Sequence, residues 1–144
     1  MAQFHFSLEK VLRWRALELA SEEAKLERLL REQLRLQTMR AGLSAEKSNL
    51  DRSLATLSEL RGADLRAVSA YNLRLKRQGQ NLAELAAQCD RELSEQKKRY
   101  RAAKQRFRLL EELRARKFEQ WRQEQAREIE SLATESFLAI WNRE

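Results

Sequence analysis

Leucine returns at every seventh position along the first part of this chain, and that repeat constrains the fold more than any other feature. Its members are Leu29, Leu36, Leu43, Leu50 and Leu57. A companion series four residues later contains Leu12, Leu19, Leu26 and Leu54, with polar residues between them. Two interleaved apolar series at spacings of three and four predict a coiled-coil seam. The 144 residues include no proline and only three glycines, which excludes a loop-rich or sheet-rich fold.

The second half of the chain repeats the same period. One series is Val68, Leu75, Leu82, Cys89, Gln96, Ala103 and Leu110, and the other is Tyr71 (one residue out of step), Ala86, Leu93, Tyr100, Phe107, Arg114 and Trp121. Between the halves, Gly62 suits a left-handed helix end and Asp64 suits the next N-cap, which predicts a turn near residues 61–65. Gly79 marks a second possible break, in which case residues 64–78 form a separate short helix.

We therefore expect an all-α fold, two long helices in an antiparallel coiled-coil hairpin that forms one elongated domain over residues 1–144. Helix one spans about 7–60, with Ser7 as its N-cap, and helix two reaches about residue 141. The numbers of two residues that face each other across the hairpin sum to about 125, and the register is defined to within one heptad. This register pairs Leu57 with Val68, Leu50 with Leu75, Leu43 with Leu82 and Leu36 with Cys89. A parallel dimer of one bent helix is the alternative.

Helix two is expected to outrun helix one at the open end of the hairpin. Helix one covers its partner only to about residue 118, so residues 119–144 overhang. One face of that overhang is apolar at helical spacing, with Ile129, Leu132, Ala133, Phe137, Ile140 and Trp141. An apolar stripe without intramolecular cover indicates a partner-binding site.

Basic residues concentrate in one segment of the second half, where seven of the twelve residues 97–108 are basic and none is acidic. They are Lys97, Lys98, Arg99, Arg101, Lys104, Arg106 and Arg108. The net charge of +7 favours acidic partners in general. Three interpretations stay open: a solvated helix face, a site for an acidic protein, and nonspecific contact with nucleic acid phosphates. Aromatic residues are not interleaved as a stacking platform.

The sequence contains few residues that could act in catalysis or bind a metal ion. His5 is the single histidine and Cys89 the single cysteine, so no Cys/His cluster at metal-ligand spacing exists. No glycine-rich phosphate loop is present. We expect no enzyme activity, cofactor or metal. The start of the chain does not resemble a signal peptide, and no run approaches the ~18 apolar residues of a membrane span, which favours a cytoplasmic protein.

The run Phe4-His5-Phe6-Ser7-Leu8-Glu9-Lys10-Val11-Leu12-Arg13-Trp14-Arg15 resembles the opening of the flagellar FliJ family. That family typically starts with phenylalanines and a Leu…Val/Leu-Leu…Arg pattern, followed by an acidic-rich helix, here with Glu18, Glu22 and Glu23. A tyrosine in a leucine-spaced segment past mid-chain also fits, here Tyr71 with Leu73 and Leu75. Related type III secretion stalk proteins are a near neighbour.

The resemblance implies a non-enzymatic stalk of the bacterial flagellar type III protein export apparatus, with a role in motility. FliJ-like proteins are antiparallel coiled coils similar to the central stalk of rotary ATPases. They bind the hexameric export ATPase, the cytoplasmic domain of the export gate membrane protein and export chaperones. Carried onto this chain, the overhang engages the ATPase, Tyr71, Arg74 and Leu75 face the gate, and residues 97–108 meet acidic loops of the ring. The protein is then monomeric alone and peripheral to the membrane apparatus.

Two other functions compete with this one. The first is a basic coiled-coil protein that binds nucleic acid nonspecifically, and the second is a homodimeric scaffold without a link to any ATPase.

Overall fold

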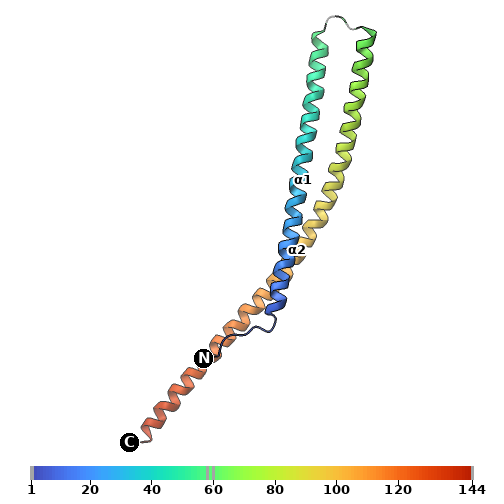
Figure 1. Cartoon of the computed structure of the whole chain (residues 1–144). Helices are drawn as coiled ribbons and strands as arrows, with labels where there is room; N and C mark the ends of the chain where they lie inside the picture. Colours follow the sequence, from blue (N-terminus) through green and yellow to red (C-terminus); the bar gives the residue numbers. More distant parts are fainter. Residues whose placement is uncertain (1, 58, 60, 144) are drawn as a thin grey trace. The chain divides into compact units, whose positions relative to one another are not determined.

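Two α-helices account for nearly all of the chain. The computed structural model describes residues 2–57, 59 and 61–143, with α1 over Glu9–Thr56 and α2 over Gly62–Trp141 (Figure 1). The helices pack against each other and no strand occurs in these described ranges. The predicted all-α helical hairpin is confirmed.

The hairpin comprises two compact units, each containing a part of both helices. One unit is Glu22–Tyr100, and the other combines Met1–Ser21 with Arg101–Glu144. The first holds the turn between the helices, and the second holds both ends of the chain.

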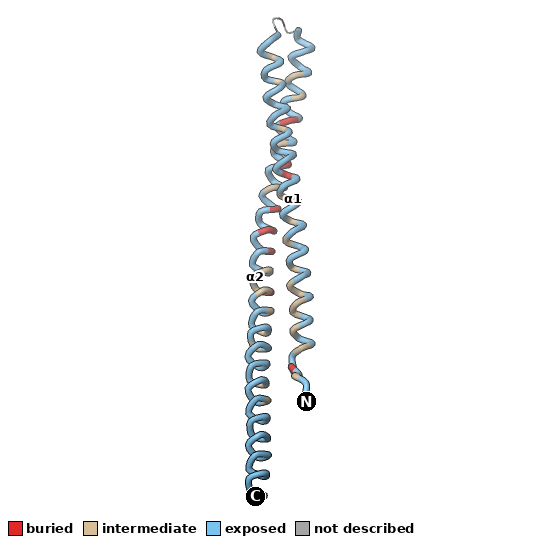
Figure 2. Tube along the Cα trace, turned by 90° about the vertical axis from the view of Figure 1, so that its left-hand side faces the viewer, coloured by how far each residue is buried: buried red, intermediate tan, exposed pale blue. Residues whose placement is uncertain are grey.

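The core of the unit Glu22–Tyr100 is the predicted seam. Leu36 from α1 packs with Leu82, Cys89 and Leu93 from α2, and all four are buried (Figure 2). Three partly buried leucines extend this cluster along α1, namely Leu26, Leu29 and Leu43. The expected partners Leu36 and Cys89 therefore share one core, as do Leu43 and Leu82. Because a leucine side chain gains roughly 1.5–3 kcal/mol on full burial, these layers hold the helices together.

One seam layer is polar. The Gln96 side chain is buried, with 5% of its surface exposed, and its amide Nε2 donates a hydrogen bond to the backbone oxygen of Glu22 at 3.0 Å. The same amide also donates to the Glu22 carboxylate. A satisfied polar pair inside an apolar seam penalises alternative registers, because a shifted helix leaves the amide buried without partners.

The turn differs in detail from the prediction. Helix α1 ends at Thr56, and Leu57 lies outside it and is 55% exposed, so the expected Leu57–Val68 layer does not form. Gly62 is the first residue of α2, and no described glycine has positive φ. The Arg61 backbone N–H donates to the Asp64 carboxylate at 3.3 Å, and the Arg61 carbonyl accepts from the Leu65 N–H at 3.0 Å. Arg61 is therefore the N-cap, and the predicted Gly62 and Asp64 caps are wrong. Residues 58 and 60, where helix one was expected to end, lie outside the described ranges.

Gly79 does not interrupt α2, which is continuous from Gly62 to Trp141, so residues 64–78 are not a separate helix. A Cβ at Gly79 would lie 3.5 Å from the Leu43 Cδ2 atom. Glycine inside a helix costs about 1 kcal/mol relative to alanine, a penalty that the surrounding seam contacts outweigh.

The second unit begins with a short non-helical arm, which comprises the described residues 2–8. The prediction of Ser7 as N-cap is wrong, because the first α-helical hydrogen bond runs from the Leu12 N–H to the Leu8 carbonyl, at 2.9 Å. The Glu9 N–H donates to the Phe6 carbonyl at 3.2 Å, and the Phe6 side chain is buried at 6% exposure. Leu8 is therefore the N-cap of α1, one residue later than expected, and the arm before it is held by the buried Phe6 side chain.

No helix in the described part of the chain contains a stretch long and apolar enough to cross a membrane.

Candidate partner-binding surfaces

The last part of α2 presents a row of apolar side chains to solvent. We call Ile129, Leu132, Ala133, Phe137, Ile140 and Trp141 the terminal stripe. Its large members are 57–69% exposed. The Phe137 and Trp141 rings lie one helical turn apart, with centroids 6.2 Å from each other and ring planes tilted by 35°. An exposed apolar surface of this kind is a candidate site for contact with a partner.

An aromatic cluster lies at the place where the N-terminal part of the chain ends its contact with α2. The Phe4 ring packs edge-on against Phe118, with centroids 5.2 Å apart, and lies 5.9 Å from the ring of Trp121. The Arg114 guanidinium lies 5.7 Å from the Phe4 centroid and donates to the Glu9 carboxylate at 3.0 Å. The arm therefore extends the cover on α2 three residues beyond the expected limit of 118, and the uncovered segment begins after Trp121.

Six of the seven basic residues of the segment 97–108 are exposed on α2 and Lys104 is half-buried, and some of the seven are paired. In the unit Glu22–Tyr100, the side chains of Lys97, Lys98 and Arg99 are exposed, and the Lys98 ammonium lies 3.5 Å from a Glu95 carboxylate oxygen. In the other unit, Arg106 pairs with Glu18 of α1 at 3.1 Å.

Arg101 and Arg108 line a shallow depression of about 310 Å³ on α2. Its other lining residues are Lys104, Gln105, Leu109 and Glu112. The depression gathers positive charge beside one exposed leucine, and that combination suits an acidic polypeptide.

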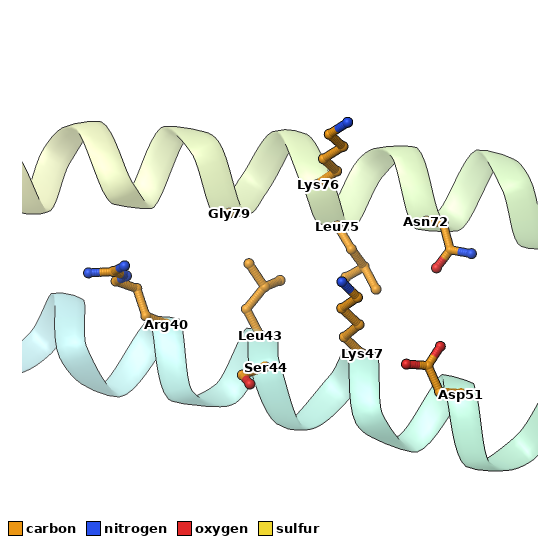
Figure 3. Close-up of a pocket in the computed structure, with 9 residues that line it drawn as sticks. All are labelled: Arg40, Leu43, Ser44, Lys47, Asp51, Asn72, Leu75, Lys76 and Gly79. Carbon is orange, nitrogen blue, oxygen red and sulfur yellow. The ribbon is translucent and has the colours of Figure 1, made fainter.

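A larger groove lies between the helices near the turn, with a volume of about 700 Å³ (Figure 3). Leu43 and Leu75 point into the space between the helices, and the Asp51 and Asn72 side chains point toward each other. Its remaining lining residues are Arg40, Ser44, Lys47, Lys76 and Gly79. Arg40 and Lys47 occupy predicted seam positions, yet both are exposed, because their long stems carry the charge out to water. Two charged seam positions in succession leave this part of the seam open.

The three residues expected to face the export gate have different environments. Leu75 is buried at 5% exposure, so it belongs to the seam and presents little surface to a partner. Arg74 is exposed. The Tyr71 hydroxyl donates a hydrogen bond to the Glu46 carboxylate, and this bond raises the pKa of Tyr71.

The described residues hold little that could support chemistry. No group of three or more His, Cys, Asp or Glu side chains within them could hold a metal ion. Cys89 is buried in the core cluster, and desolvation is the main cause of its raised pKa. A buried thiol with a raised pKa is a poor nucleophile, because the reactive form is the thiolate.

Sequence reasoning missed the aromatic cluster and the groove. The cluster has a weak signal in the spacing of Phe118 and Trp121, which continues one edge of the seam. The sequence signal for the groove is clearer. Arg40 and Lys47 occupy consecutive positions of one seam series, and two charged residues there predict a layer that is not filled by apolar side chains.

Comparison of the chain with protein-family models, with curated protein sequences and with solved structures gives no match.

Proposed function

We propose that this protein is a non-enzymatic coupling stalk of a flagellar-type protein export apparatus, which engages a hexameric export ATPase through the terminal stripe. The single observation that carries this proposal is the change along α2 from a helix paired with α1 to a lone helix with an exposed apolar face. A two-helix coiled coil that continues as a single helix with one apolar face suits insertion into the central opening of a ring.

The sequence adds two supports. The N-terminal run from Phe4 to Arg15 resembles the FliJ family, whose members bind the export ATPase. Arg101 and Arg108 give α2 a basic face just before the aromatic cluster, and acidic loops at the entrance of a ring would complement it.

The hairpin near the turn is the proposed contact with the export gate. Tyr71 and Arg74 lie on that part of α2, and the groove over Leu43 and Leu75 gives it an apolar floor with charged borders. Export chaperones are proposed as further partners on the family resemblance alone. The proposed location is the cytoplasmic side of the membrane apparatus.

Stimulation of ATP hydrolysis tests the proposal. The protein is added to the cognate export ATPase hexamer, and the steady-state rate of hydrolysis is measured. We expect the wild-type protein to raise this rate, and we expect the triple variant Ile129→Gln/Phe137→Gln/Trp141→Gln to leave it at the level of the hexamer alone. Normal stimulation by the triple variant refutes the assignment of the terminal stripe to the ATPase.

A matched control separates this effect from a general loss of apolar surface. Leu17, Leu34 and Leu85 are 70%, 63% and 49% exposed and lie outside the terminal stripe. Their replacement together by glutamine removes three exposed apolar side chains but should leave stimulation intact.

The basic segment supports a second candidate function, nonspecific binding to nucleic acid. With about six phosphate contacts, binding weakens by roughly 10³ between 50 and 200 mM salt. Titration with labelled duplex DNA at physiological salt decides between the two candidates, because tight binding there favours nucleic acid, and its absence favours the export role.

A further inference from the structure

Glutamates flank the terminal stripe on both sides of its centre. In a helix of 3.6 residues per turn, Glu128 and Glu135 lie seven residues apart on one edge, next to Leu132. Glu130 lies on the other edge, next to Phe137. All three glutamates are exposed, and none forms a salt bridge in the part of the chain that the structure describes.

The charge of this segment differs from that of the helix before it. Residues 122–143 contain three arginines and four glutamates, a net charge of −1, whereas residues 101–117 contain seven basic and two acidic residues, a net charge of +5. Arg127 lies one turn before Glu130 and next to it, so it offsets part of the negative charge of that edge, whereas no basic residue lies next to Glu128 or Glu135. Arg122 and Arg143 lie at the two ends of the segment. The apolar surface therefore has one edge that is purely acidic, that of Glu128 and Glu135, although the whole chain carries +7.

This border acts against pairing between two copies. In a parallel helix pair the two different edges face each other, and in an antiparallel pair each edge faces its own kind. An antiparallel pair brings the edge of Glu128 and Glu135 against itself, acid against acid, and a parallel pair brings it against the edge that carries Glu130 and Arg127. Like charges at such flanking positions destabilise a helix pair, and this repulsion is a known means of excluding wrong partners.

We infer that the terminal stripe docks on an apolar surface bordered by lysine or arginine side chains, and that its acidic edge disfavours pairing of the protein with itself there. The stripe continues the seam of the hairpin past the aromatic cluster, so its partner takes the place that α1 has on the preceding part of α2. The identification of this partner as the ATPase ring rests on the proposed function. The inferred chemistry of its surface does not depend on that function.

The chain itself supplies the probe for a test without any ATPase. The variant Glu128→Lys/Glu130→Lys/Glu135→Lys presents the same apolar stripe with basic borders. We expect the wild-type protein alone and the variant alone to be monomeric in sedimentation equilibrium. An equimolar mixture should form a heterodimer at least about tenfold tighter than either homodimer, since several flanking pairs of a few tenths of a kcal/mol each change from repulsive to attractive.

Two controls define the result. The variant Glu23→Lys/Glu27→Lys/Glu84→Lys carries the same total charge at exposed positions away from the stripe, and its mixture with wild type should stay monomeric. In 1 M salt, where the Debye length is about 3 Å, the heterodimer should lose its preference over the homodimers.

The inference is overturned if the mixture forms no heterodimer, or if wild type pairs with itself as tightly as with the lysine variant. Failure of the ATPase assay with success of the mixing experiment would reject the proposed function and keep the partner chemistry.

Discussion

The replacement of Leu36 by alanine offers a sharp test of the hairpin, because α1 contains its own control two residues away. Leu36 is 3% exposed and belongs to the core cluster, whereas Leu34 is 63% exposed on the same helix. A buried Leu→Ala change costs about 2–5 kcal/mol, the sum of lost transfer free energy and the cavity that remains. Since a seam between two helices is close to water and can relax, we expect the lower end, about 2–3 kcal/mol.

Leu34→Ala should change the free energy of unfolding by less than about 0.5 kcal/mol, because little apolar area is lost and alanine is the better helix former. Urea denaturation, followed by far-ultraviolet circular dichroism, measures the free energy of unfolding of both variants. The slope of this free energy against urea concentration should equal that of the wild-type protein. Equal effects of the two substitutions would show that α1 does not pack on α2 through the predicted face, and the reasoning would fail.

Four further predictions concern other parts of the molecule. Gly42→Ala should stabilise the protein by about 0.5–1 kcal/mol in the same urea assay, because an added Cβ meets nothing within 4 Å and alanine lowers the entropy of the unfolded chain. Phe4→Ala removes two aromatic contacts worth about 1 kcal/mol each, so amide hydrogen exchange in the first turn of α1 should accelerate by roughly 30-fold. Cys89 should resist alkylation in the folded protein and react quickly in urea, as followed by mass spectrometry; rapid labelling without urea contradicts its burial. The hydrogen bond from Arg15 is the main cause of the lowered pKa of Glu18, so its stabilising effect is present above the ordinary pKa of a glutamate and is lost as the pH falls through the lower folded pKa. Glu18→Gln should reduce this acid-induced loss in thermal melts recorded between neutral and acidic pH.

Much of the fold could be predicted because a heptad repeat reports directly on burial. In α2 the series that contains Leu75, Leu82, Cys89, Gln96 and Ala103 is buried at every one of these positions. Each residue lies on the inner face, whatever its chemical type, because the period of the repeat decides the face and the side chain only decides the strength of packing.

The ends and breaks of the helices were less predictable, because they depend on contacts that are distant in sequence. Ser7 has the right chemistry for a cap, but burial of Phe6 and the cluster of Phe4 with α2 determine where the helix starts. Gly79 suggests a break, yet seam contacts on both sides of it, Leu75 and Leu82, keep the helix intact.

The candidate surfaces were predicted to different extents. The terminal stripe follows from counting how far helix one can reach, and the structure leaves its large residues exposed. The assignment of Leu75 to a binding surface conflicts with its place in the seam, since one side chain cannot both fill the core and face a partner. Which partners bind the stripe, the basic segment and the groove stays a prediction, because recognition depends on the shape and charge of another molecule.

The central claim is that the terminal stripe contacts the export ATPase, and site-specific photo-crosslinking tests it most directly. A photoreactive phenylalanine analogue replaces Phe137 in one variant and Leu34, which is equally exposed at 63%, in another. The account predicts a crosslink to the ATPase hexamer from position 137 and none from position 34. Crosslinks of equal yield from both positions, or a crosslink from position 34 alone, would contradict it.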